Sequence, residues 1–383
     1  AGLGLKYLES YVEDYDIPSS IFEFSYANSG KKIKSEDFLN YLKSKTTKDL
    51  SWFENDYLTT NKKIDYTIKN ITDKNDSLEI SITNKRDFTA PIQLYGIQDK
   101  EVKFKKWLTN IDSTTTITIP KGNFNKLSLN YESQLPEYNL RNNWKDTNNK
   151  IFNRPLQLKF FKDIEDTYYN QLFYTPIYKY NYYDGLVLGM SFSNKTLLNK
   201  NINYKLTPSF STKSNTVSGS ASFQYEYLPE NKKINKFSFG ISGSNFLYAP
   251  NLSYTTVKPY AFIEFRRKSL RDVRKKALVA SYTFIDKEKS PTQTEHYETN
   301  KYSVFNLGYG YSNPGIIDDL RFSTDLEVSS KFSKLSLTAQ YRKLTDANRQ
   351  FDFRFFAGAF ITNKTETNYF SFALDRPTDY LFQ

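Results

Sequence analysis

The chain has 383 residues, no Cys and a formal net charge of +11 at pH 7. The lack of Cys excludes a disulfide framework and thiolate chemistry. The basic excess is spread along the chain beside 42 acidic residues and forms no long tract, so we expect no nucleic-acid partner. The densest basic cluster, residues 266–276 (RRKSLRDVRKK), is interpreted as a turn or loop between two strands.

The aromatic content is high for a chain that is hydrophilic on average. Tyr and Phe number 31 each, aromatic residues make up 17% of the chain, and the mean hydropathy is −0.65. A transmembrane β-barrel has this composition because its apolar outer face and aromatic girdles alternate with a polar interior. No apolar run of about 18 residues is present, so we expect no transmembrane helix.

Residues 1–60 are predicted to be helical. Apolar residues first recur at helical spacing, and Pro18 then predicts the first turn of a second helix. Ser35 predicts the N-cap of a third helix, because two acidic residues and an apolar face follow it. Asp49 or Ser51 is expected to cap a last short helix.

From about residue 63 the hydrophobic period changes to two, which predicts short strands. We predict roughly six or seven strands, at 64–68, 78–82, 91–97, 102–107, 114–119 and 126–130. Their number and spacing predict a small β-sandwich over residues 61–130. Residues 131–184, which are rich in Asn, Tyr and charge, are interpreted as a linker that packs on its neighbours.

Residues 185–383 alternate apolar and polar side chains over long segments. Within 217–227, for example, Val, Gly, Ala, Phe and Tyr take one face and Ser, Gln and Glu the other. The segments are about ten residues long, enough for a tilted strand to cross a bilayer, whereas soluble strands average about five or six. We predict eleven strands, at 186–194, 201–211, 217–227, 235–245, 255–266, 276–286, 302–312, 320–329, 335–342, 350–361 and 368–375.

Residues 180–194 (YNYYDGLVLGMSFSN) are predicted to mark the boundary between an aqueous half and a bilayer half. The three Tyr rings at 180, 182 and 183 are suited to the headgroup level of a membrane. Beyond the Asp-Gly turn, the alternation predicts two opposite faces. Leu186, Leu188 and Met190 are expected to face lipid, opposite Val187, Gly189 and Ser191.

The alternative interpretation is a large soluble β-sandwich or an adhesin stack. Strand length, sustained alternation and aromatic rings on one face favour the membrane. A sheet edge in lipid leaves backbone groups unpaired, so we expect a closed barrel with an even number of strands. Eleven is odd, and no export signal precedes AGLGLKYLES, so we expect the chain to be part of a longer polypeptide, incomplete at both ends.

No catalytic or metal-binding motif is found in the sequence. The chain has one His, His296, which cannot by itself form a zinc site of the usual kind. HExxH, a Gly-rich phosphate loop and GxSxG are all absent. The adjacent acidic pairs at 13–14 and 318–319 are expected to be solvated, because neighbouring side chains in regular structure point apart. We therefore predict no catalytic, cofactor-binding or metal-binding residue in this chain.

Three stretches resemble the zinc-dependent aminopeptidase family of membrane alanyl aminopeptidases. They are AGLGLKYLESYV at 1–12, KDLSWFENDYLTTNKKIDYTI at 48–68 and LPEYNLRNNWKD at 135–146. The second is similar to a K-D-L-S-W-F-F-x-x-W-L segment of that family, with Glu54 and Tyr57 in place of its second Phe and second Trp. The resemblance implies a zinc peptidase whose ligands and general base lie upstream of these residues, so that this chain alone is inactive.

The long-stranded half resembles bacterial outer-membrane barrels of the surface-antigen type, through YNYYDGLVLGMSFS and FFAGAFITN…FSFALDRPTDYLF. Together the two resemblances imply the C-terminal part of an outer-membrane-anchored metallopeptidase, with lipid and possible envelope proteins as partners, a peptide substrate for the parent and a periplasmic soluble part. The alternative is a non-catalytic outer-membrane assembly or transport component with a degenerate peptidase-like scaffold. A soluble binding or adhesion protein is the third hypothesis.

Overall fold

The fold is taken from a computed structural model, which divides into two compact units. The first comprises 1–157 and 166–170, and the second 158–165 and 171–383. The structure describes residues 2–13, 16–60, 62–148, 150, 152–197, 200–230, 233–269, 271–289, 300–365 and 370–372.

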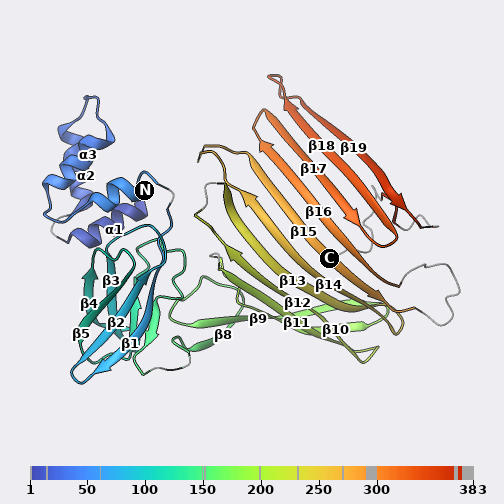
Figure 1. The fold of residues 1–383 in the computed structure, drawn as a ribbon, viewed down its shortest axis with the longest axis horizontal. Helices are drawn as coiled ribbons and strands as arrows, with labels where there is room; N and C mark the ends of the chain where they lie inside the picture. The colour runs from blue at the N-terminus through green and yellow to red at the C-terminus, as the bar shows by residue number, and fades with distance from the viewer. Residues whose placement is uncertain are drawn as a thin grey trace. The chain divides into compact units, whose positions relative to one another are not determined.

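The first unit begins with short helices, α1 (Gly2–Val12), α2 (Ile17–Ala27), α3 (Ser35–Ser44) and a π-helical turn η1 (Phe53–Tyr57) (Figure 1). Asp16 caps α2 by accepting a hydrogen bond from the Ser19 amide at 2.9 Å. Ser35 is the first residue of α3 and not its N-cap as predicted, because the chain enters the helix at Lys34, whose amide donates to the Asp37 carboxylate at 2.8 Å. No helix in the described chain is long and apolar enough to cross a membrane.

Two antiparallel sheets follow in the same unit. One has the order β1–β2–β5 and the other β4–β3–β6–β7. The strands are β1 (Tyr66–Lys74), β2 (Ser77–Asn84), β3 (Ile92–Gln98), β4 (Glu101–Leu108), β5 (Thr114–Pro120), β6 (Lys126–Leu129) and β7 (Trp144–Asp146). The first six correspond to the six strands predicted from the period-two pattern.

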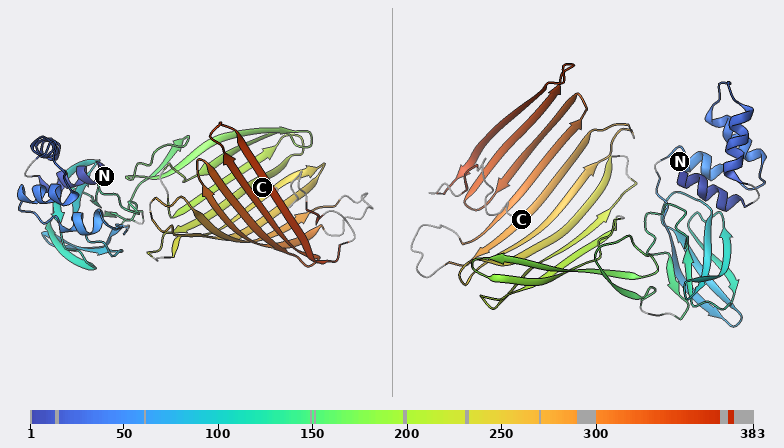
Figure 2. Two further views of the ribbon diagram at one scale, coloured as in Figure 1. Left: turned by 90° about the horizontal axis from the view of Figure 1, so that it is seen from above. Right: turned by 180° about the vertical axis from the view of Figure 1, so that it is seen from behind.

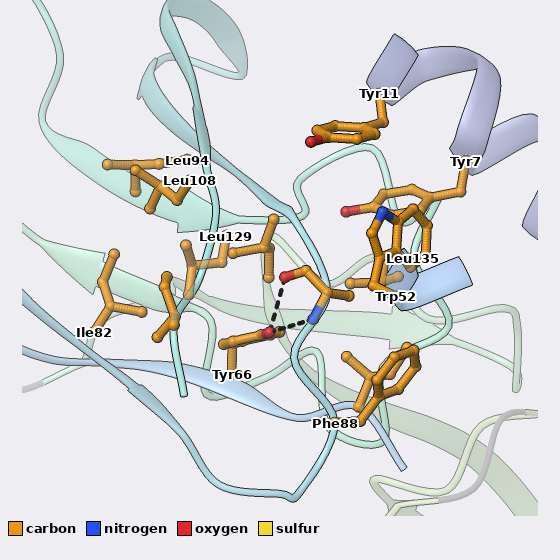
Figure 3. Close-up of a cluster of buried hydrophobic side chains, with 14 of the residues drawn as sticks. Tyr7, Tyr11, Trp52, Tyr66, Ile82, Phe88, Leu94, Leu108, Leu129 and Leu135 are labelled. Atoms are coloured by element: carbon orange, nitrogen blue, oxygen red, sulfur yellow. Dashed lines mark hydrogen bonds between the residues drawn. The ribbon is translucent and has the colours of Figure 1, made fainter. Parts of the chain in front are cut away.

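One apolar core joins the helices to both sheets. Leu8 and Trp52 from the helical segment, Ile80 from one sheet and Leu94 from the other are all buried in it. The Trp52 ring makes an edge contact with Tyr7, with 5.8 Å between ring centroids. Figure 3 shows the two rings beside each other. The helical segment and the two sheets thus form one unit with a shared core, whereas the sequence predicts a helical region 1–60 and a sandwich 61–130 as separate domains.

The second unit is a single antiparallel sheet of twelve strands in the order β19 to β8, each strand beside its sequence neighbour (Figures 1 and 2). The strands are β8 (Leu156–Phe160), β9 (Asn170–Asn181), β10 (Gly185–Ser193), β11 (Ile202–Ser211), β12 (Thr216–Tyr227), β13 (Ile234–Ala249), β14 (Leu252–Phe265), β15 (Lys275–Lys287), β16 (Lys301–Pro314), β17 (Asp318–Val328), β18 (Phe332–Leu344) and β19 (Gln350–Asn363). Most have ten or more residues. The β-rich architecture predicted for this half is confirmed.

The details of the strand count differ from the prediction. Ten of the eleven predicted strands are present as β10–β19. The predicted strand 368–375 falls mainly outside the described residues, and the described ones there, 370–372, are not in a strand. The predicted linker 131–184 contains β7, β8 and β9, and the last two extend the large sheet. In the described residues this sheet is open, with β8 and β19 at its edges.

Candidate functional surface

The second unit presents one continuous apolar face. Strand register shows this directly, because residues paired across an antiparallel ladder point to the same face. Leu188 pairs with Tyr178 on one side and Phe210 on the other, and the series continues strand by strand to Leu335 on β18. Exposed members, one from each of several strands, are Tyr178, Leu188, Leu206, Phe223, Ile241, Val257, Phe284, Leu335 and Phe353.

The opposite face carries polar side chains together with one buried apolar cluster, formed by Tyr254, Ile285, Tyr302, Val304 and Phe332. On β12 it carries Ser218, whose hydroxyl lies 3.0 Å from that of Ser209 on β11. On β17 and β18 it carries Glu327 and Lys334, which form an ion pair at 3.4 Å. The Lys334 ammonium also donates to the backbone carbonyl of Phe370 at 3.1 Å, so the described residues 370–372 pack on this face. The exposed apolar face is therefore continuous, whereas the opposite face combines polar groups with this apolar cluster.

The boundary stretch 180–194 is ordered by a compact turn. The side chain of Asn181 accepts hydrogen bonds from the amides of Tyr183 and Asp184 and donates to the Asp184 carboxylate at 2.7 Å. Gly185 follows with φ +68°, a conformation that favours glycine. The three Tyr rings of this stretch, at 180, 182 and 183, are exposed, and the sequence predicts them to lie at the boundary.

The two faces of β10 correspond to those predicted from alternation. Leu186 and Leu188 are exposed, with fractions of 42% and 49%. Val187, which points the other way, is only 6% exposed. Met190 pairs with Pro176 on the same face as the two leucines. The structure therefore confirms which residues of this strand share a face.

Aromatic rings gather on the apolar face near the strand ends that join β16 to β17 and β18 to β19. Tyr311 stacks on Phe322 with 5.1 Å between ring centroids. The hydroxyl of Tyr341 donates to the Asp318 carboxylate at 2.6 Å, and Lys343 pairs with the same carboxylate at 2.9 Å. Rings that are apolar on one side and hydrogen-bonded at the tip are typical of side chains at a boundary between apolar and aqueous surroundings.

The described members of the acidic pairs, Glu13, Asp318 and Asp319, are each engaged with other residues. Asp318 and Asp319 point to opposite faces of β17, as expected for neighbouring residues in a strand. Asp319 binds Arg321 on one face, and Asp318 accepts from Tyr341 on the other. Glu13 accepts a hydrogen bond from the Trp107 indole at 3.0 Å, which ties α1 to β4. Asp14 and His296 lie outside the described residues. Within the described part of the chain no group of three or more His, Cys, Asp or Glu side chains could hold a metal ion.

The first unit contains a hollow of about 350 Å³ lined by Tyr11, Trp52 and the aspartates Asp49, Asp56 and Asp112. Each of its carboxylates already has a partner, and they form no group that could hold a metal ion. Hydrogen bonds from Ser51 hold the pKa of Asp49 below its usual range. The partners of the three aspartates are Ser51, Lys62 and Thr89 respectively.

Glu137 is a half-buried residue whose carboxylate is enclosed by hydrogen-bond donors, which the sequence did not reveal. One oxygen accepts the Tyr66 amide at 3.0 Å, and the other accepts the side-chain amides of Asn130 at 2.9 Å and Asn143 at 2.6 Å. Burial raises the pKa of Glu137 to about 7, and these three hydrogen bonds oppose the rise. Together these hydrogen bonds join the start of β1, the end of β6 and the segment before β7. We therefore assign Glu137 a structural role.

Comparisons of the chain with protein-family models, with curated proteins and with solved structures each found no match. The continuous apolar face, defined by strand register, is the candidate functional surface of the described residues.

Proposed function

We propose that the large sheet is embedded in a lipid bilayer, the bacterial outer membrane, and anchors the first unit to it. The observation that supports this most strongly is the apolar face that continues from β9 to β19 by strand register. An exposed apolar patch of this extent is unfavourable in water and is covered in soluble proteins by another layer of structure. In a bilayer, the same face contacts hydrocarbon.

The strand lengths fit this environment. A tilted transmembrane strand needs about 9–11 residues, and β11–β19 have between 10 and 16. The aromatic rings near the strand ends suit the headgroup level. Since backbone groups of an edge strand need partners in lipid, the proposal requires that the edges of this sheet are paired in the membrane.

The zinc peptidase part of the proposal rests on the resemblance of residues 1–12, 48–68 and 135–146 alone. Under it, the intact parent is an outer-membrane-anchored aminopeptidase with its soluble part in the periplasm. The described residues do not fit a zinc site, since no suitable group of ligands is present among them. This chain then contributes anchoring and no chemistry of its own. Incubation with aminopeptide substrates and zinc is expected to give no turnover above background, and clear turnover would contradict this assignment.

The bilayer proposal can be tested by labelling, because the chain has no native Cys. Single Cys substitutions on β12 are labelled with an environment-sensitive fluorophore and reconstituted into vesicles. Labels at Val217, Ala221 and Phe223 are expected to report an apolar surrounding. Labels at Ser218, Ser220 and Ser222, which point to the other face, are expected to report a polar one. If the emission of the label does not alternate between successive positions of β12, the proposal is overturned.

A charge test uses two exposed positions on neighbouring strands. Leu206 lies on the apolar face of β11, and Ser220 lies on the polar face of β12 beside Thr207. Leu206→Lys is expected to destabilise the vesicle-inserted sheet by about 2–4 kcal/mol, while Ser220→Lys is nearly neutral. Equal effects would contradict a lipid-facing role for β11. Monodisperse behaviour without detergent would instead favour the soluble binding or adhesion protein.

The alternative function, an assembly or transport component, differs in what the sheet does once inserted. Stepwise ion conductance across a planar bilayer would favour it, and a silent bilayer with retained insertion would favour an anchor.

A further inference from the structure

The polar face of the large sheet carries a group of seven polar side chains where β17, β18 and β19 meet their short connections. Residues that pair across neighbouring strands form a row. Two such rows lie on this face, because residues two apart in a strand share a face. Arg321, Gln340 and Arg354 pair across the strands in the first row. The second row consists of Asp319, Arg342 and Asp352, with Gln350 two residues before Asp352.

This surface is concave. Two adjoining hollows of about 360 Å³ and 500 Å³ share Asp319, Arg321, Arg342 and Gln350 in their walls. Gly315, in the connection between β16 and β17, lines the second hollow. Either volume is ample for a small ligand of a few non-hydrogen atoms.

The three arginines are paired to different extents. Asp319 holds Arg321 in a two-point contact, with Nε to Oδ1 at 3.0 Å and Nη2 to Oδ2 at 2.7 Å. This carboxylate and this guanidinium therefore largely neutralise and orient each other. Arg321 therefore forms part of the wall of the hollow but adds little uncompensated positive charge to it.

Arg342 and Arg354 keep unused hydrogen-bond donors. Arg342 donates through Nη2 to the carbonyl of Gly315 at 3.2 Å and lies 3.9 Å from Asp319, while its Nε is buried without an acceptor. Arg354 is exposed and forms no ion pair or hydrogen bond with the described part of the chain. Asp352 accepts a hydrogen bond from Gln350 at 2.6 Å.

The two incompletely paired guanidinium groups lie on neighbouring strands in adjacent rows. Diagonal neighbours of this kind are separated by about 7–8 Å between Cα atoms, within reach of long side chains. A guanidinium presents several N–H groups in one plane, which match the oxygens of phosphate or carboxylate. Two such groups with Gln340 beside them provide donors for a tetrahedral oxyanion.

We propose that this hollow binds a phosphate group, held between Arg342 and Arg354. The phosphate belongs either to a small soluble ion or ester or to a lipid headgroup. The site stands independently of the membrane proposal, since it uses only residues of the polar face. Asp352, opposite Arg342, opposes the ligand electrostatically and limits its affinity.

The test is titration of the full chain, in micelles of an uncharged detergent at low ionic strength, with inorganic phosphate by calorimetry. Saturable binding in the millimolar range or tighter is expected. Arg354→Gln is expected to weaken it about tenfold or more, and Asp352→Asn to strengthen it. The Arg354 side chain has no hydrogen bond or ion pair within the described chain to lose, so this variant is expected to fold and tests binding. Arg342→Gln, which also loses the Gly315 hydrogen bond, is the second variant.

The matched control is Arg274→Gln. Arg274 lies in the loop between β14 and β15, where Asp272 holds it by contacts of 2.7 Å and 3.0 Å. The control removes the same charge elsewhere, so binding is expected to be unchanged. If Arg274→Gln weakens phosphate binding as much as Arg354→Gln, the effect is one of net charge and the proposal is overturned.

A second arm separates the two sources of phosphate. The chain is mixed with vesicles of phosphatidylcholine alone or with added phosphatidylglycerol, and association is measured for the wild type and Arg354→Gln. Binding of inorganic phosphate that depends on Arg354 supports a soluble ligand. Arg354-dependent association with phosphatidylglycerol without binding of inorganic phosphate supports a lipid headgroup. If neither probe binds in an Arg354-dependent manner, the site does not exist.

Discussion

The carboxylate of Glu137 accepts a hydrogen bond from the backbone amide of Tyr66, 3.0 Å away, across 71 residues of sequence. This contact fixes the segment before β7 against the start of β1. A parallel bridge between Ile64 and Glu137 lies beside it, and the Tyr138 amide donates to the Ile64 carbonyl at 2.8 Å. The carboxylate of Glu137 thus holds the segment before β7 and the start of β1 together.

Glu137 makes the stability of the first unit depend on pH. Its pKa is about 7 in the folded state against 4.5 for an unperturbed Glu, so the folded state binds this proton more tightly than the unfolded chain. The free energy of unfolding is therefore expected to fall by about 3 kcal/mol as pH rises from about 4.5 to 7, and this group adds no further slope outside that window.

The measurement is denaturant unfolding followed by Trp fluorescence, since all three Trp residues lie in the first unit. Glu137→Gln removes the titrating group and is the control for other carboxyls. The difference in unfolding free energy between wild type and variant is expected to shift in favour of the variant as pH rises through the window. A difference that is independent of pH would contradict the raised pKa.

The hydroxyl of Tyr66 stabilises the chain around Ala90. It donates to the Ala90 carbonyl and accepts from the Ala90 amide, both at 2.9 Å, as the dashed lines in Figure 3 show. Tyr66→Phe leaves both buried backbone groups without this partner and is expected to lower stability by about 1–3 kcal/mol. Tyr41→Phe, which removes an exposed hydroxyl bonded to Glu23, is the control and is expected to change stability by less than about 0.5 kcal/mol.

Gly4 allows α1 to approach Tyr57. A Cβ at Gly4 would lie 2.3 Å from the Tyr57 ring, whereas a Cβ at Gly2 would meet nothing within 4 Å. Gly4→Ala is expected to lower the unfolding free energy by about 1–3 kcal/mol because the ring must move within a packed core. Gly2→Ala in the same helix is expected to be neutral or slightly stabilising. Equal changes in the two variants would argue against this close contact.

Gly219 is required by the pairing of β11 with β12. Its φ is +154°, and a Cβ there would lie 2.3 Å from the Thr207 carbonyl oxygen. Gly219→Ala is expected to destabilise the large sheet by about 1–3 kcal/mol, measured as thermal unfolding by circular dichroism in detergent. Gly310→Ala on β16, where nothing lies within 4 Å, is the matched control. An unchanged melting temperature in Gly219→Ala would show that β11 and β12 are not paired in this register.

Local patterns in the sequence were sufficient for most of the elements outside residues 131–184. Side chains alternate across a strand, so the period of two in 217–227 predicted both the strand and the residues that share its faces. Pro18 predicted the first turn of α2 because its fixed φ suits that position. The length of the strands in the second half was also readable, because each apolar–polar alternation runs without interruption between polar turns.

The tertiary structure decided what lies between elements. The Asn- and Tyr-rich segment 131–184 has no clear period, so β9 emerges only because β10 is available to pair with it. Glu137 is an ordinary carboxylate in sequence, and its burial depends on Tyr66 and Asn143 being brought around it. Arg342 and Arg354 likewise become neighbours only through the register of β18 and β19, which is set by the turn between them and by the pairing of apolar side chains on the opposite face.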